Sequence, residues 1–126
     1  MLIWVEKMPE FNTIDGVNLI EKCISCNSIT SDIKLNEFVK KCQTHKCKHT
    51  CFKKSKDKCR FNYPMCESNL TRILSEDEIP RNKNKFVIMK RSSTDKFINN
   101  YNPIILDMWQ ANMDIQPIGT VFGIAF

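Results

Sequence analysis

Two histidines and four cysteines gather in one short stretch of this 126-residue chain, CQTHKCKHTCFKKSKDKCRFNYP at residues 42–64. Imidazole and thiolate groups are the ligands that zinc takes in closed four-coordinate protein sites, often as short ligand pairs separated by a loop. The candidate ligands are His45, Cys47, His49, Cys51 and Cys59. Their types and spacing predict a structural zinc site.

The first four candidates occupy every second position from His45 to Cys51. In an extended segment, successive side chains point to opposite faces, so all four would lie on one side. A basic loop then leads to Cys59, which can fold back to complete a tetrahedral site. Five candidates compete for four positions. We predict His45, Cys47, Cys51 and Cys59 as the ligands, with His49 as the alternate ligand or as a hydrogen-bond partner of a ligand.

The cysteines have two other interpretations. Cysteines are often buried as small apolar residues, and a disulfide framework would suit a small secreted domain. Seven cysteines is an odd number, the first residues do not resemble a secretory signal, and the cysteines alternate with histidines, all of which favour zinc. Cys23 and Cys26 form a C-x-x-C, but Cys23 fits an apolar helix face better than a metal or redox pair. Cys66 is not expected to bind metal.

Positive charge is concentrated in the same stretch. Nine Lys or Arg residues and one acid, Asp57, lie between Lys40 and Arg60, a local charge of +8 in a chain whose net charge is +5. Such a cluster favours nucleic acid as the partner. Phosphate contacts are expected from Lys46, Lys48, Lys53, Lys54, Lys56, Lys58 and Arg60, with Tyr63 as a stacking surface for a base. Packing beneath the metal site is the other role for these aromatic side chains; it is favoured for Phe61 and left open for Tyr63.

HKCKHTC followed by CRFNYP resembles the zinc-knuckle segment of Helitron-type rolling-circle transposases, which join an HUH nicking domain to an ATP-dependent DNA helicase. The opening MLIWVEKMPEF resembles the strand after the HUH motif, and residues 99–126 resemble the segment before the catalytic tyrosine. The resemblance implies one partial Rep nicking domain (Helitron helicase-like domain) over residues 1–126. It also implies an inserted zinc knuckle at residues 42–66, called the knuckle below.

The resemblance implies a remnant of a transposase that keeps a zinc-stabilised, basic DNA-binding module, with single-stranded DNA as partner. No His-x-His, tyrosine motif or G-x-x-x-x-G-K-[ST] occurs in the sequence, so this chain alone is expected not to be an enzyme. An independent zinc-binding interaction module is the alternative function. No apolar run approaches the length of a membrane span. Nuclear or cytoplasmic localisation is expected, with neither a membrane nor a small-molecule substrate as partner.

The fold class expected is α+β, a partial antiparallel sheet of an HUH-nuclease-like domain with flanking helices. An apolar share of 42% and a charged share of 26% suit one small domain. The expected strands are residues 2–5, a hairpin of 86–90 with 96–98, and 113–118. Residues 75–84 read as an exposed loop.

Helical spacing begins at Asp15, the expected N-cap, and recurs from Ser31 or Asp32 to about Lys41. The apolar positions of the second helix are Ile33, Leu35, Phe38 and Val39. A third helix is expected at residues 104–112, with Ile105, Met108 and Trp109 facing inward. A further helix would be capped by Thr120.

Overall fold

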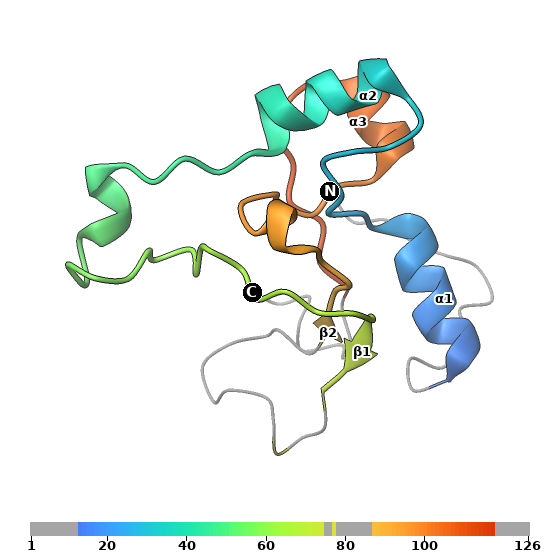
Figure 1. Ribbon diagram of the computed structural model, residues 1–126, viewed down its shortest axis with the longest axis horizontal. Helices are drawn as coiled ribbons and strands as arrows, with labels where there is room; N and C mark the ends of the chain where they lie inside the picture. Colours follow the sequence, from blue (N-terminus) through green and yellow to red (C-terminus); the bar gives the residue numbers. More distant parts are fainter. Residues whose placement is uncertain (1–12, 75–76, 78–86, 118–126) are drawn as a thin grey trace.

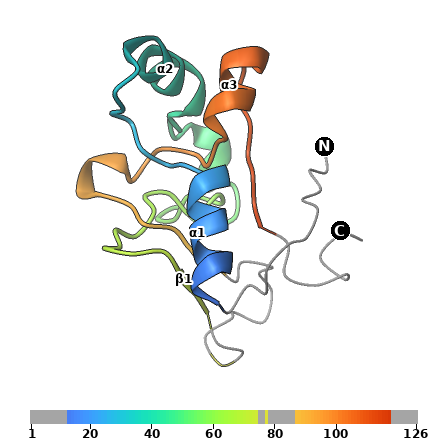
Figure 2. The same cartoon turned by 90° about the vertical axis from the view of Figure 1, so that its right-hand side faces the viewer.

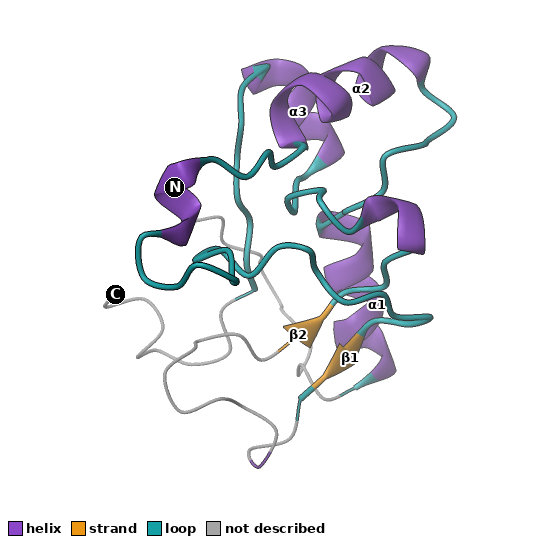
Figure 3. Cartoon of the chain, turned by 60° about the vertical axis from the view of Figure 1, so that its left-hand side comes forward, coloured by secondary structure: helices purple, strands orange, loops and turns teal. Residues whose placement is uncertain are grey.

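The computed structural model describes residues 13–74, 77 and 87–117. Its helices are α1 (Ile14–Cys23), α2 (Ile33–Phe38) and α3 (Pro103–Trp109), and its strands are β1 (Arg72–Ile73) and β2 (Val87–Ile88). Short helical turns are η1 (Val39–Gln43), η2 (His49–Phe52) and η4 (Ser93–Asp95). Figures 1 and 3 show a mixture of helix and a small antiparallel sheet, as expected for the coarse fold class. The larger HUH-nuclease sheet stays a prediction.

Helix α1 is capped two residues earlier than expected. The N-cap is Thr13, whose side-chain oxygen accepts a hydrogen bond from the Gly16 N–H at 3.1 Å. The prediction of Asp15 as N-cap was wrong, because Asp15 already lies in the first helical turn. There its carboxylate faces the positive end of the helix dipole. Ile20 is buried and fixes α1 to the core.

Helix α2 is shorter than the sequence predicted. Asp32 caps it by accepting from the Leu35 N–H at 3.2 Å, but regular α-helix ends at Phe38. The chain continues to Gln43 as the wider π-turn η1. The wider turn shifts the direction of the side chains that follow Phe38. Val39 is completely buried, whereas Ile33, expected on the apolar face, is 77% exposed.

Helix α3 has a different inward face from the one expected. Asn102 is its N-cap and Pro103 its first residue, which suits proline because that position needs no N–H donor. Leu106 is completely buried, whereas Met108 and Trp109 are 80% and 66% exposed. The prediction of Met108 and Trp109 as inward was wrong. Figure 2 shows α3 beside α2, and the two helices contact each other.

Strand pairing also differs from the prediction. Strand β2 pairs antiparallel with β1, with Arg72 opposite Ile88 and Ile73 opposite Val87. The predicted hairpin of residues 86–90 with 96–98 is therefore wrong. The sequence pattern located the strand that contains Val87 and Ile88, but it did not identify β1 as the strand that pairs with it.

A buried arginine explains why residues 91–98 do not form a hairpin. Nη1 of Arg91 donates to the carbonyl oxygens of Asp95 at 2.7 Å and Ile98 at 2.6 Å. Nη2 donates to Oδ1 of Asn100 at 3.2 Å. The chain curls around the guanidinium, and these carbonyls satisfy a charge that would be costly to bury alone.

The C-terminal part of the described chain, residues 113–117, does not join a sheet. Residues 113–117 form no strand, contrary to prediction, although Met113 and Ile115 pack against the core. The expected strand at 2–5, the helix capped by Thr120 and the loop at 75–84 apart from residue 77 lie outside the described residues.

The core lies between the three helices and the segment around Tyr101. Tyr101 and Leu106 are completely buried, and the Tyr101 hydroxyl donates to the carbonyl oxygen of Asn27 at 2.7 Å. The knuckle projects to one side of this core (Figure 1). Its shape must therefore depend on local contacts and on whatever its Cys/His cluster binds.

Candidate metal centre

Both ends of the knuckle are hydrogen-bonded to the same short segment. The His45 N–H donates to the Phe97 carbonyl at 2.7 Å, and the Met65 N–H donates to the Lys96 carbonyl at 2.8 Å. Because Lys96 and Phe97 are consecutive, the entry and exit of the loop are held close together. These two backbone hydrogen bonds anchor the loop at its base without using any of its side chains.

Four side chains of the knuckle converge within this loop. The ligand atoms of His45, Cys47, Cys51 and Cys59 all lie within 4.8 Å of one another. His45 Nε2 lies 3.5 Å from the Cys59 sulfur and 3.7 Å from the Cys51 sulfur. Nitrogen and sulfur ligands of a tetrahedral zinc ion are separated by roughly 3.5 Å. These four residues are therefore close enough to bind one metal ion, with spacings that fit zinc.

The turn η2 positions Cys51. The Cys51 N–H donates to the Lys48 carbonyl at 2.9 Å, and the Lys48 N–H lies 3.4 Å from the Cys51 sulfur. The Cys51 carbonyl accepts from the Arg60 N–H at 2.9 Å. This last bond joins the two halves of the loop directly beside the Cys51 and Cys59 side chains.

A tight turn positions Cys59. The Asn62 N–H donates to the Cys59 carbonyl at 2.9 Å, and Asn62 has a φ of 65°, a left-handed conformation that asparagine tolerates better than most residues. Burial opposes ionisation of the Cys59 thiol, but backbone N–H groups of Phe61 and Tyr63 donate to its sulfur, and the net effect lowers its pKa. Such donors stabilise a thiolate, the form that binds metal.

The other two candidate ligands have shifted pKa values as well. Burial lowers the pKa of His45, which favours the neutral imidazole that can coordinate a metal. Desolvation, together with the neighbouring Cys59 and Cys51, raises the pKa of Cys47. A divalent cation among these thiols would replace their protons and remove the repulsion between thiolates.

Aromatic rings hold the histidine in place. The Tyr63 ring stacks on the His45 ring with centroids 4.1 Å apart and planes 10° apart. Phe61 meets the same imidazole edge-on at 5.7 Å. Phe61 remains 47% exposed, so it only partly fills the packing role expected of it. A ligand held between such neighbours keeps its orientation.

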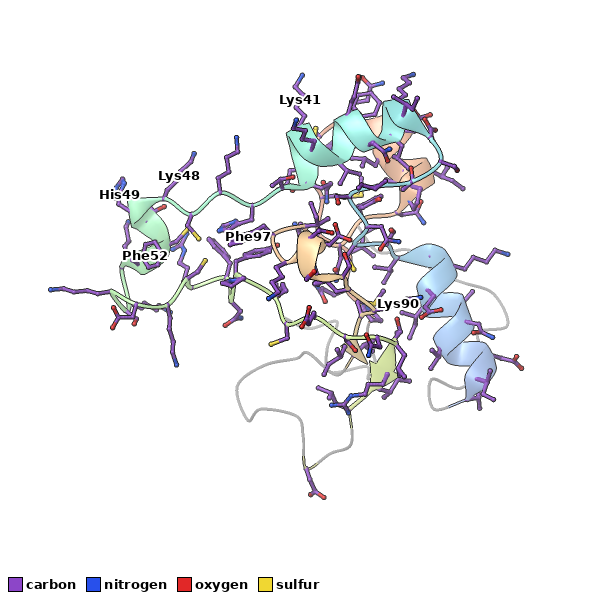
Figure 4. The ribbon with its side chains drawn as sticks, viewed as in Figure 1. Lys41, Lys48, His49, Phe52, Lys90 and Phe97 are labelled. Carbon is purple, nitrogen blue, oxygen red and sulfur yellow. The ribbon has the colours of Figure 1, made fainter. Side chains whose placement is uncertain are left out.

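His49 does not join the cluster. The extended alternation expected from His45 to Cys51 breaks at His49, where η2 begins. A 3₁₀ turn has about three residues per turn, so the period of two is lost and His49 and Cys51 no longer share a face. Figure 4 shows His49 at the outer end of the knuckle, and it is exposed. Cys66 is likewise exposed and outside the cluster.

The expected phosphate-contacting residues are all accessible. Lys46, Lys48, Lys53, Lys54, Lys56, Lys58 and Arg60 are exposed, and Tyr63 is half-buried. The ion pair found between described residues joins Lys34 to Asp107, both outside the knuckle. The Arg60 guanidinium lies over the Phe61 ring at 4.6 Å. Acids of the described chain therefore leave the charge of the knuckle available to a partner.

Cys23 of the C-x-x-C lies on the apolar side of α1, as the sequence suggested. Cys23 packs against the core, and the buried Cys26 sulfur donates to the Lys90 carbonyl at 3.0 Å. Burial raises the pKa of Cys26, which opposes thiolate chemistry. Among the described residues, the metal-sized cluster is the one in the knuckle.

Sequence reasoning missed two residues that build the site. Gln43 is 1% exposed and fixes the entry to the knuckle, while Phe97 supplies a carbonyl for His45 and a ring near Tyr63. Gln43 acts across more than 50 residues of sequence, and Phe97 reaches residues 34 and 52 positions away. The one available signal for Phe97 was an aromatic residue in an otherwise polar stretch.

No family model, curated protein or solved structure matches this chain. Within the part of the chain that the structure describes, no helix is long and apolar enough to cross a membrane.

Proposed function

We propose that the knuckle binds one structural zinc ion through His45, Cys47, Cys51 and Cys59. The observation that carries this proposal is the convergence of four ligand atoms within 4.8 Å. Three sulfurs and one imidazole nitrogen favour zinc over magnesium or calcium, which prefer oxygen ligands. All four positions would be filled by protein, as in structural rather than catalytic zinc sites.

Elemental analysis of protein purified without added metal tests the zinc site. We expect one equivalent of zinc, lost in Cys51→Ser and in Cys59→Ser but kept in the control Cys66→Ser, which alters an exposed cysteine outside the cluster. Structural zinc contributes folding free energy on the order of 10 kcal/mol in small sites. A chelator should therefore change the circular dichroism of wild type. Less than half an equivalent of zinc, with no effect of chelator, would contradict the proposal.

We further propose that the zinc-loaded knuckle binds single-stranded DNA. The segment from Lys40 to Arg60 carries a formal +8, and three thiolates with one Zn²⁺ lower this to about +7. The exposure of its lysines supports phosphate contact. Fluorescence anisotropy with a labelled oligonucleotide at low salt tests the proposal, and no binding by zinc-loaded, folded protein would contradict it.

The Helitron resemblance supplies a biological setting for such binding. We propose that the chain is a remnant of a Helitron-type transposase that contributes DNA affinity but neither nicking nor helicase activity. Incubated with single-stranded DNA and Mn²⁺ or Mg²⁺, it should leave the strand intact and form no covalent adduct. A DNA product linked to Tyr63 or Tyr101 would contradict this.

An independent zinc-binding interaction module is the second candidate function. Exposed apolar side chains on neighbouring helices favour it: Ile33 on α2, and Ile104, Met108 and Trp109 on α3, are each at least 66% exposed. A module of this kind would recognise a protein through those helices. If the zinc-loaded, folded protein bound neither single- nor double-stranded DNA in the low-salt anisotropy measurement, this second function would be favoured.

A further inference from the structure

Phe97 lies beside the knuckle although it is far from it in sequence. Its carbonyl oxygen accepts from the His45 N–H at 2.7 Å. Its ring lies 6.3 Å from the Tyr63 ring, with the two planes only 10° apart. Figure 4 shows Phe97 at the base of the knuckle. Phe97 is 41% exposed, so an aromatic surface is available at the base of the knuckle.

The other two aromatic rings of the site are more fully engaged. The Tyr63 ring is half-buried and stacked on His45 at 4.1 Å. The Phe61 ring has His45 at its edge and the Arg60 guanidinium over it at 4.6 Å. Among the described residues, Phe97 has a ring contact with Tyr63 alone. Of the three rings, Phe97 can accept a base without displacing a cation or the metal-binding histidine.

We propose that Phe97 stacks on an unpaired base of the single-stranded DNA whose phosphates lie along the basic side of the knuckle. This inference rests on the DNA-binding function proposed above and adds a residue to it. It assigns a different role to Tyr63, which positions His45. Every base has an aromatic face, so stacking on Phe97 adds affinity without selecting a sequence.

Stacking on Phe97 would also discriminate between single and double strands. In a duplex both faces of each base are covered by neighbouring base pairs, so only the phosphate contacts remain. Those contacts are similar for single and double strands, apart from charge density. A protein that uses Phe97 in this way prefers single strands, and the preference depends on the ring.

The experiment compares an oligothymidylate with an abasic oligonucleotide of the same length and charge. Binding is measured by fluorescence anisotropy for wild type, Phe97→Leu and Phe97→Trp. Wild type should bind the abasic strand roughly 5- to 150-fold more weakly, the range that one stacked base supplies. Phe97→Leu should bind both strands with similar, weak affinity, and Phe97→Trp should restore the difference.

Controls separate stacking from folding. Trp109→Leu removes an exposed ring on α3, 66% exposed and distant from the knuckle in sequence, and should keep the wild-type difference. Zinc content is measured for each variant. If Phe97→Leu lost zinc, the stacking role would still be tested by two measurements. These are the difference between the oligothymidylate and the abasic oligonucleotide in wild type and the same difference in Phe97→Trp.

The outcomes distinguish the two proposals. Failure of wild type to bind either strand would overturn the DNA-binding function itself. Equal binding of both strands by wild type would leave DNA binding intact and overturn the stacking role. An unchanged difference in zinc-loaded Phe97→Leu would assign stacking to another ring and overturn the role of Phe97.

Discussion

Gln43 and Met113 are joined by two hydrogen bonds between one side-chain amide and one backbone. Gln43 Nε2 donates to the Met113 carbonyl at 2.9 Å, and the Met113 N–H donates to Gln43 Oε1 at 2.8 Å. The same Nε2 also lies 3.3 Å from the Asn99 carbonyl. The Gln43 side chain therefore pairs with the Met113 backbone as a neighbouring strand would. Because Gln43 lies two positions before His45, the first proposed ligand, these bonds connect the C-terminal segment to the start of the knuckle.

Gln43→Ala should lower the free energy of unfolding by about 2–4 kcal/mol, because buried backbone groups lose their partners while their desolvation cost remains. Urea unfolding of the zinc-loaded protein measures the loss. The matched control is Gln116→Ala. Gln116 is exposed and bonds only to the Asp114 carboxylate in the described structure, so a change within about 0.5 kcal/mol is expected. Equal effects of the two substitutions would contradict the role of Gln43.

The two histidines provide a sharper test of the metal site than any cysteine. Nε2 of His45 lies 3.5 Å from the Cys59 sulfur, whereas His49 lies outside the cluster. His45→Ala should lose most bound zinc, and His49→Ala should keep a full equivalent with unchanged circular dichroism. Competition with a chromogenic chelator gives both affinities. The reverse order would make His49 the fourth ligand.

The convergence of the four proposed ligands could be predicted because metal-binding potential is carried by residue type and short spacing. His45, Cys47, Cys51 and Cys59 come from one stretch of 15 residues. The predicted cause of this convergence, an extended segment from His45 to Cys51, was partly wrong. Such a segment would also have placed His49 on the same face as the other candidate ligands. The η2 turn that removes His49 depends on backbone hydrogen bonds around Cys51, which side-chain alternation does not reveal.

The packing around the site could not be read from periodicity. Arg91 resembles a surface residue in sequence but is 6% exposed, with its guanidinium surrounded by oxygen acceptors. Helix α3 has an apolar residue at almost every position, so its inward face depends on where α2 lies. Gln43 and Phe97 act on partners far away in the sequence, such as Met113 for Gln43 and His45 for Phe97. Each of these outcomes is decided by tertiary contacts that override local pattern.

Tyr101 should make stability fall at alkaline pH. Its hydroxyl is hydrogen-bonded to the Asn27 carbonyl, and burial raises its pKa above the ordinary value of about 10. Above about pH 10 the unfolded chain releases this proton while the folded chain keeps it, so unfolding becomes more favourable as pH rises. The slope for one such proton is about 1.4 kcal/mol per pH unit.

Tyr101→Phe should cost about 1 kcal/mol at pH 7, because the hydrogen bond is lost. That cost should shrink as the pH passes 10, since phenylalanine has no proton to release. Urea unfolding of both proteins at pH 7, 9, 10 and 11 tests this, and the lysines and the metal site are the same in each. A difference that stays constant up to pH 11 would exclude a raised pKa at Tyr101.

The last prediction concerns where DNA lies on the protein. If three or four knuckle cations contact phosphates, log K against log salt should have a slope of about −2 to −3 on single strands. Replacing Lys53, Lys54 and Lys56 by Ala should weaken binding equally for all sequences and flatten the slope by about 1–2. The control replaces Lys22, Lys34 and Lys90, exposed lysines outside the knuckle, and changes net charge by the same amount. Anisotropy titrations at several salt concentrations should give the control a slope close to wild type. If the two triple variants flatten the slope equally, DNA is attracted by the overall charge of the protein and not bound along the knuckle.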